Sequence, residues 1–440
     1  MKKLSIVFCM FAFWVVPMAA TEASPPQALI FKVATKVACA ERGLQCTVLD
    51  ISRSELGNQL AYYRALIKVD SGDFDVIAIS RVVREVHPGV PFTASGTYFY
   101  LHGSNGSFYQ ALVAPHGDKG LAVYLGGHKI DVWGIDLRNV QISGNTTLLP
   151  NAHDWGFDLQ IKDVRLATRI ARYVRGLTGQ GLGRLVLSGH SAGGALAYAV
   201  ANAEAVLPVL NRDIAALIPM DIVYQLPPSA TGQIQFSCNV AGGYKSMNES
   251  GFYFFNNLGS ISLGKLAQTD PNGISTYSSP STNVQAVLEN AARLGFWPVY
   301  PFHAWAVIRD GSGVAVDGRY TEIADIVQNS INSPAFQIPN AMIADMFAAS
   351  CPTLNSPYVG NLDKVKVPVF YVGMAGGFGK VGEYTLSALG SEDKKAVTIQ
   401  LQPDDDAAND FGHMEAFRAR DTQKLVWEPI FQWIAQHPIH

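Results

Sequence analysis

The stretch from Arg184 to Val206 constrains the fold most strongly, because it joins an apolar run, a tight turn and an alanine-rich segment. The apolar run covers residues 185–187, and the alanine-rich segment covers residues 195–206. Between them lies Gly-His-Ser-Ala-Gly, centred on Ser191. Small flanking residues let a strand and a helix pack closely around a strained serine. We therefore predict a buried strand, a sharp turn and a helix.

This arrangement gives the serine the setting of a nucleophile. The helix that follows would place its N-terminal amides beside Ser191, where negative charge develops in acyl transfer. The five-letter pattern alone is weak in a chain with 40 glycines. The prediction therefore depends on the strand before it and the helix after it.

The composition is that of a globular chain with a sizeable core. Of 440 residues, 48% are hydrophobic and 16% are charged, and the net charge is −3. No basic patch or run is present, so we expect no nucleic-acid partner. The length allows one large core with an insertion, or two domains.

The N-terminus has the parts of a secretory signal peptide. Two lysines precede an apolar run over residues 4–16, and small residues follow, with cleavage expected after Ala20 or Ala23. We predict a signal peptide over residues 1–23 and a secreted or periplasmic protein. An uncleaved membrane anchor is the alternative, although the run is short for a span.

Four cysteines remain after signal cleavage, and an even number fits two disulfides in an exported chain. We predict the pairs Cys39–Cys46 and Cys238–Cys351, because the first two are close in sequence and the second two would join the ends of a central segment. Four cysteines allow three pairings, and free buried thiols are the alternative. Zinc-ligand spacings are absent, so we expect no metal and no other cofactor.

Apolar runs of strand length alternate with helical patterns along much of the chain. Strands are expected at residues 64–69, 75–83, 97–101, 131–137, 185–187, 214–220, 365–373 and 396–401. Helices are expected at residues 27–42, 119–129, 159–177, 195–206, 381–389 and 425–436. This alternation predicts a mostly parallel sheet covered by helices on both faces, with a leading hairpin as an antiparallel edge.

The alternation stops between residues 222 and 363, which are rich in aromatic residues, Gly, Ser, Asn and Pro. This break predicts an insertion. The expected parts are a signal peptide (1–23), an N-terminal extension with the first strand (24–74), a first core part (75–221), the insertion (222–363) and a second core part (364–440).

A serine nucleophile needs a base, and the base needs an acid that orients it. His413 is the candidate base, because it lies in the loop between the last expected strand and the last expected helix. The rivals are His437 and His440 at the terminus and His303 in the insertion. His190 adjoins the serine, and we expect it to point away from the tip and to pack.

The acid should follow a strand between the serine and the base. Asp221 directly follows the strand at residues 214–220 and is the first choice. The next strand is followed by no carboxylate until Glu383, the alternative acid. Asp410 is expected to serve a solvated turn, although it could reach His413 from its own loop. The other acidic residues around His413 are expected in solvated turns or at the surface; they are Asp404, Asp405, Asp406 and Glu415.

Two backbone amides should bind the oxyanion. One is that of Ala192, directly after the nucleophile. The other should come from the loop after the strand at residues 97–101, where Gly103 lets the backbone approach the substrate and Ser104 is the chosen donor. A plain turn is the alternative interpretation of this loop.

In their order along the chain, these features resemble the α/β-hydrolase superfamily over roughly residues 75–440. The matching segments are residues 100–103, 130–138, the serine turn, residues 365–369 and Gly412 with His413. The resemblance implies an α/β fold with a mostly parallel eight-stranded sheet, a Ser–acid–His triad, and a cap or lid inserted after Asp221.

This chain departs from the family pattern at the acid. Most members carry it after the strand that corresponds to residues 367–372, where this chain has Met374-Ala375-Gly376-Gly377. A subset that includes pancreatic-type lipases carries the acid one strand earlier, which favours Asp221.

The resemblance implies an exported serine hydrolase of carboxylic esters, a lipase or esterase. Aromatic residues at 251–255 and 295–305 could line an acyl pocket or form the insertion's own core. Amidases, peptidases and thioesterases use the same triad, and a non-catalytic binding protein of this fold is a further alternative. The expected partners are a small-molecule or lipid ester and, transiently, a lipid surface. The oligomeric state stays open.

Overall fold

The computed structural model describes residues 21–22, 25–114, 120–146, 152–293, 295–296, 299–300 and 302–438. Most of the predicted signal peptide lies outside these residues, as do Trp297 and His440. Within the described part of the chain, no helix is both long and apolar enough to cross a bilayer.

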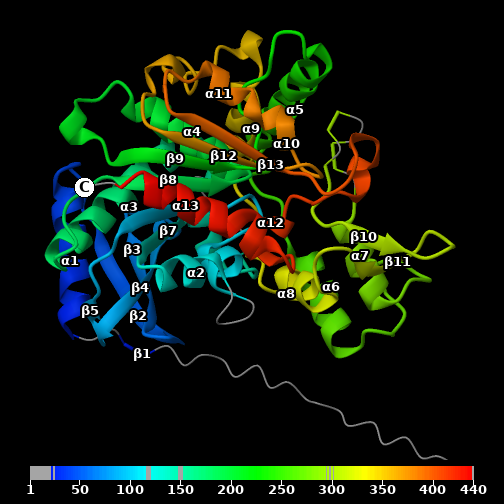
Figure 1. Cartoon of the computed structure of the whole chain (residues 1–440), viewed down its shortest axis with the longest axis horizontal. Helices are drawn as coiled ribbons and strands as arrows, with labels where there is room; N and C mark the ends of the chain where they lie inside the picture. Colours follow the sequence, from blue (N-terminus) through cyan, green and yellow to red (C-terminus); the bar gives the residue numbers. More distant parts are fainter. Residues whose placement is uncertain are drawn as a thin grey trace, which may run out of the picture.

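A mixed sheet of eleven strands forms the centre of the molecule (Figure 1). Its strands are β1 (Thr21–Glu22), β2 (Thr47–Gly57), β3 (Leu60–Lys68), β4 (Val76–His87), β5 (Val90–Pro91), β6 (Gly96–Leu101), β7 (Ile130–Asp136), β8 (Leu185–His190), β9 (Ile214–Met220), β12 (Val369–Met374) and β13 (Lys394–Ile399). The spatial order is β1-β2-β3-β4-β7-β6-β8-β9-β12-β13, and β5 pairs with β4.

The sheet changes character along this order. From β7 to β13 every neighbouring pair is parallel, whereas the pairs from β1 to β4, and β4 with β7, are antiparallel. All eight strands predicted from the sequence are present, namely β3, β4, β6, β7, β8, β9, β12 and β13. The structure adds β1, β2 and β5 at the antiparallel edge.

Helices cover both faces of the sheet. They are α1 (Pro25–Ala40), α2 (Leu121–Gly127), α3 (Phe157–Leu177), α4 (Ala192–Glu204), α10 (Gly379–Glu383), α11 (Thr385–Ala388), α12 (Glu415–Arg418) and α13 (Glu428–Gln436). Phe99 and Leu101 of β6 pack into a cluster with α1, α3 and α4, whereas Tyr98 and Tyr100 pack with α2 and α13. Burial on both faces explains why these strands are almost continuously apolar.

Residues 222–368 lead from β9 to β12 and are called the connecting segment below. They hold α5 (Thr231–Glu249), α6 (Leu258–Thr269), α7 (Asn283–Ala291), α8 (Ile323–Ile331) and α9 (Asn340–Ala349), with the separate hairpin of β10 (Val307–Arg309) and β11 (Ala315–Gly318). The elements α6, α7, α8, β10 and β11 share a hydrophobic cluster of their own and stand to one side of the sheet (Figure 1). α5 and α9 pack on each other, and α9 contacts α3 and α4.

Both predicted disulfides are present. Cys39 near the end of α1 bonds to Cys46 just before β2. Cys238 in α5 bonds to Cys351 just after α9. The second disulfide therefore ties together two parts of the connecting segment that are 113 residues apart in sequence.

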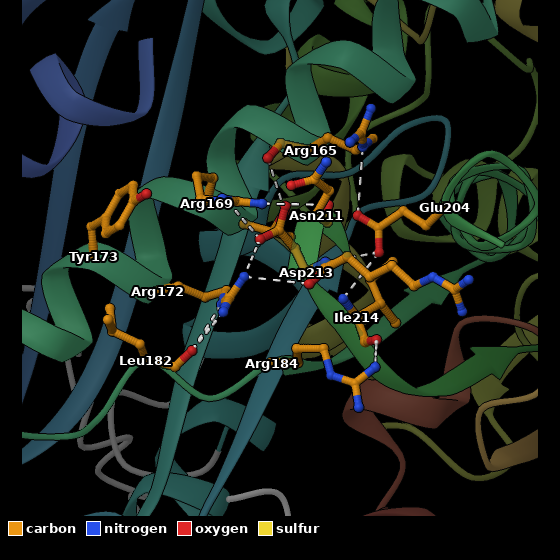
Figure 2. A network of polar contacts seen from close by, with 12 residues as sticks. Arg165, Arg169, Arg172, Tyr173, Leu182, Arg184, Glu204, Asn211, Asp213 and Ile214 are labelled. Atoms are coloured by element: carbon orange, nitrogen blue, oxygen red, sulfur yellow. Dashed lines mark hydrogen bonds and ion pairs between the residues drawn. The ribbon is translucent and has the colours of Figure 1, made fainter. Parts of the chain in front are cut away.

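A buried network of charged residues lies at the N-terminal end of β9, the end opposite to Asp221 (Figure 2). Asp213, fully buried just before β9, accepts hydrogen bonds from Arg169 Nε at 2.7 Å and Arg172 Nη1 at 2.5 Å, both on α3. Glu204 at the end of α4 accepts from the backbone N–H groups of Asp213 and Ile214 at 2.9 and 3.1 Å. Because these bonds join α3, α4 and β9, they hold the N-terminal end of β9 in place. Asp221 and the serine turn lie at the other end of the parallel strands.

Candidate functional site

The serine turn has the shape that its sequence predicts. Ser191 lies between β8 and α4 with φ 56° and ψ −127°, a strained conformation for a residue with a Cβ. A Cβ added at Gly189 would overlap the Gly193 carbonyl, and one at Gly193 would overlap the Leu101 carbonyl. The two glycines therefore allow strand, helix and the neighbouring strand end to meet beneath the serine.

Asp221 and His413 are brought together by two different strand ends. The Nδ1 atom of His413 lies 2.5 Å from Asp221 Oδ2, and both side chains are buried. The other carboxylate oxygen, Oδ1, accepts backbone N–H groups of Met374, Phe378 and Gly379 at 2.9, 3.1 and 3.0 Å. The turn after β12 thus supplies amide donors to an acidic residue that follows the neighbouring strand β9.

The rival acids and bases lie elsewhere. Glu383 accepts a hydrogen bond from Thr398 Oγ1 on β13 at 2.6 Å. Asp410 closes its own turn by accepting from the backbone N–H groups of Leu401 and Phe411, but it is fully buried, so the expectation of a solvated position is wrong. His437 stacks on Trp433 near the C-terminus.

The connecting segment holds the loop that carries His413. The N–H groups of His413 and Met414 donate to the carbonyls of His303 and Ala304 at 3.0 and 2.9 Å. A Cβ at Gly412 would lie 2.7 Å from the Ala304 carbonyl oxygen, so glycine permits this close approach. His303, a rival base in the sequence, is therefore part of the support of His413.

His190 has a partner that its sequence position did not suggest. Its Nε2 atom lies 2.9 Å from the His413 carbonyl, and a carbonyl can only accept, so Nε2 carries the proton. Burial lowers the pKa of His190 well below its ordinary value, which keeps the ring neutral. The residue before the serine thus hydrogen-bonds to the backbone of the candidate base, in addition to packing.

The loop after β6 passes directly beside the serine. A Cβ added at Gly103 would lie 3.2 Å from Ser191 Cβ. His102 Nε2 accepts the Leu137 N–H at 3.1 Å, so its proton is on Nδ1, which donates to the Gly103 carbonyl at 2.8 Å. The N–H groups of Ser104 and Ala192 donate to no other group in the described chain. Both amides are therefore free to bind an oxyanion.

Glycine at position 377 keeps the acid in place. A Cβ there would overlap Asp221 Oδ2. Displacing a catalytic group by about 1 Å typically costs about 10²-fold in rate. We therefore expect Gly377→Ala to lower kcat/KM for the ester hydrolysis proposed below by about 10²-fold, measured in steady-state assays on a p-nitrophenyl ester. The control is Gly360→Ala, where an added Cβ meets nothing within 4 Å; an equal loss in both variants would contradict the prediction.

Glu415 was expected at the surface, and that prediction is wrong. The side chain is fully buried, and its Oε2 accepts the Gly412 N–H at 2.5 Å, which explains its inward position beside the His413 loop. Burial raises the pKa of Glu415 from 4.5 to about 8, against the effect of its hydrogen-bond donors.

This raised pKa predicts a pH dependence of stability. On raising the pH, the unfolded chain releases the proton near pH 4.5 and the folded chain releases it only near pH 8, so the folded state loses stability between these values. Urea unfolding midpoints measured from pH 4 to 9 should decline less in Glu415→Gln than in the wild type. An identical decline in both proteins would mean that Glu415 does not contribute.

One cavity of about 490 Å³ contains Ser191 and His413 in its wall. Ala192, Ser104 and several aromatic residues also line it, among them Phe296 and Phe302 of the segment at residues 295–305. The other aromatic segment, residues 251–255, is not part of the lining. Its Phe254 packs instead with Trp155 of the first core part and with Phe336, so there the insertion is packed against the core and does not form a core of its own. In the described chain, no group of three or more His, Cys, Asp or Glu is placed to hold a metal ion.

Comparisons with known proteins bear on the fold. No family model and no curated protein matches the chain. A solved structure of a proposed lipase from Sulfolobus solfataricus aligns with a TM-score of 0.58 at 17% identity, covering 88% of this chain and 99% of that one. A monoglyceride lipase from Saccharomyces cerevisiae (TM-score 0.43, 13% identity, 84% and 94% covered) and the esterase LipA from Xanthomonas oryzae (0.43, 14%, 86% and 92%) also align.

Proposed function

Because the chain has the α/β-hydrolase fold, we propose that it is an exported serine hydrolase that cleaves carboxylic esters through an acyl-enzyme on Ser191. The observation that carries the proposal is the 2.5 Å contact of His413 with the buried Asp221, because His413 lines the same cavity as Ser191. A neutral His413 with its proton on Nδ1 has Nε2 free to accept a proton from the serine hydroxyl.

The proposed reaction proceeds in two halves. Ser191 Oγ attacks the ester carbonyl carbon while His413 Nε2 takes its proton, and the N–H groups of Ala192 and Ser104 stabilise the oxyanion. His413 then gives the proton to the departing alcohol, and the acyl-enzyme remains. A water molecule, deprotonated by His413, attacks the acyl carbon and releases the acid together with free Ser191.

Export is proposed from the N-terminal sequence and the two disulfides. Lys-Lys followed by an apolar run and small residues is the pattern of a signal peptide, and disulfides persist in oxidising compartments. Residues 222–363 are proposed to act as a cap that selects the substrate, because side chains from this segment line much of the cavity.

A fluorophosphonate probe tests the nucleophile. We expect stoichiometric labelling of folded protein, with the adduct mapped to Ser191 by mass spectrometry, and no labelling after unfolding. An unlabelled folded protein would refute the catalytic proposal and favour a binding protein of the same fold. A series of p-nitrophenyl esters from acetate to palmitate then tests the acyl pocket, and equal rates across the series would contradict an apolar one.

A further inference from the structure

The cavity beside Ser191 is polar in one part, yet histidine is the only acidic or basic residue among the described residues that line it. None of the described residues that line it is Asp, Glu, Lys or Arg. A charged group that entered would lose its hydration without gaining a counter-charge. The cavity therefore disfavours a substrate that carries a charge near its ester bond.

Amides and hydroxyls form the polar part of the cavity lining, called the amide wall below. Its members come from the loop after β6, from the residues next to it, and from the connecting segment. They are Asn105, Gln110, Asn256, Asn257, Ser260, Asn290, Asn329, Ser330, Ser333 and Gln337. Each side chain carries a hydrogen-bond acceptor, a donor or both, without a net charge.

Hydrogen bonds tie this wall to the reaction centre. Gln110 Nε2 donates to Asn329 Oδ1 at 3.3 Å and to Ser333 Oγ at 3.2 Å. Gln337 Nε2 donates to Asn257 Oδ1 at 3.2 Å. The N–H of Ile338, next to Gln337, donates to the carbonyl of Ser104 at 2.9 Å. The amide wall therefore begins at the residue that is proposed to bind the oxyanion.

One acceptor in the wall has no hydrogen-bond partner among the described residues. Gln110 is 2% exposed, and its Oε1 atom is buried and accepts no hydrogen bond, although its Nε2 donates. A buried acceptor without a donor is costly. Because Oε1 has less than 1 Å² of accessible surface, a hydroxyl group of a bound molecule would supply that donor once the Gln110 side chain turns toward the cavity.

Next to His413, the cavity lining is apolar instead of polar. Phe302 lies 5.2 Å from Phe296, 5.1 Å from Phe378 and 4.7 Å from the His413 ring, measured between ring centroids. Ile343, Met346 and Phe347 extend this apolar lining. An apolar chain and a hydroxyl-rich group can therefore be bound at the same time.

We infer that the substrate is an ester that joins an apolar acyl chain to an uncharged, hydroxyl-rich alcohol of sugar type. The inference rests on the proposed function and narrows its substrate class. The amide wall offers more donors and acceptors than a simple alcohol could use, and a sugar ring presents several hydroxyls within a few bonds of the ester. The apolar lining accounts for the acyl chain, and no described lining residue is an Asp, Glu, Lys or Arg that would pair with an ionic head group.

Four lauroyl esters with one acyl chain and different alcohols test the inference, each used below its critical micelle concentration. They are 6-O-lauroylglucose, ethyl laurate, lauroylcholine and O-lauroyl-lactate, whose alcohols are hydroxyl-rich, apolar, cationic and anionic. We expect kcat/KM for the glucose ester to exceed that of each other ester by about tenfold or more, since a site built for hydroxyls discriminates against groups that leave it unpaired. Equal or faster hydrolysis of a charged ester, or of ethyl laurate, would overturn the inference.

Two substitutions test whether the amide wall causes the preference for the glucose ester. Gln110→Met removes the unpartnered acceptor at similar volume and should lower the glucose-to-ethyl ratio of kcat/KM about tenfold. Asn290→Ala, at an exposed position of the wall, should lower it to a smaller extent. The ratio is independent of the folded fraction. The matched control is Gln160→Met, a fully buried glutamine on α3 outside the cavity, which should keep the wild-type ratio.

Three further outcomes distinguish among the role of the amide wall, the substrate class and the proposed function. An unchanged ratio in both Gln110→Met and Asn290→Ala would overturn the role of the amide wall. Hydrolysis of none of the four esters, together with no phosphonate labelling of Ser191, would refute the proposed function itself. Labelling of Ser191 without hydrolysis of the glucose ester would refute only the substrate class.

Discussion

Replacing Asp221 by asparagine should lower kcat on a p-nitrophenyl ester by about 10⁴-fold, the loss expected when the base is held in the wrong tautomer. The position of Oδ1 is surrounded by three backbone donors, from Met374, Phe378 and Gly379. Only an oxygen can accept from them, so the asparagine must place its oxygen there and direct its Nδ2 group at the histidine.

This orientation disables the base. The Nδ2–H group would donate to His413 Nδ1, and the ring proton would then sit on Nε2. A protonated Nε2 cannot accept the proton of Ser191. The fold should be retained, because all three backbone donors keep their acceptor.

The matched control is Glu383→Gln, at the alternative acid. Its carboxylate bonds to Thr398 Oγ1, and a glutamine oxygen can accept the same hydrogen bond, so we expect activity within about twofold of the wild type. Steady-state rates of both variants, measured beside their thermal midpoints, decide the assignment. A 10⁴-fold loss in Glu383→Gln with a near-normal Asp221→Asn would reassign the acid.

Removal of the disulfide between Cys238 and Cys351 should destabilise the protein by about 5 kcal/mol, because it closes a long loop in the unfolded chain. The two cysteines are 113 residues apart and join α5 to the end of α9. The Cys238→Ala/Cys351→Ala double variant should therefore unfold at a much lower urea concentration than the wild type.

The other disulfide provides the comparison. Cys39 and Cys46 are separated by only 7 residues, and the same loop-closure relation gives about 2.5 kcal/mol for Cys39→Ala/Cys46→Ala. Urea unfolding of both double variants measures the difference. A larger loss for the short loop would show that local contacts, rather than chain entropy, dominate.

Strands buried on both faces were predictable from the sequence, because their apolar runs are nearly continuous. Strand β2 was not, because only Ile51 and Leu56 of its eleven residues are buried, so no apolar run is visible. The helix after Ser191 begins at Ala192, three residues earlier than predicted. Two consecutive glycines disfavour a helix start by propensity, and here close packing on the Leu101 carbonyl overrides it.

The site was predictable where local sequence determines it and unpredictable where distant segments meet. The pairing of Asp221 with His413 followed from strand order. The buried position of Glu415 did not, because it depends on a bond to the Gly412 N–H within a folded loop. The amide wall could not be predicted either, because Asn and Ser in an irregular stretch of sequence are also typical of exposed turns.

The connecting segment supports both sides of the reaction centre, and this has a consequence for engineering and evolution. Its His303 and Ala304 carbonyls hold the loop of His413, and its Ile338 amide holds Ser104. A chain shortened to its sheet and flanking helices would therefore lose the alignment of the proposed base and oxyanion donors, and with it the proposed selectivity. Exchange of this segment between homologues would succeed only if these three backbone attachments were transferred with it.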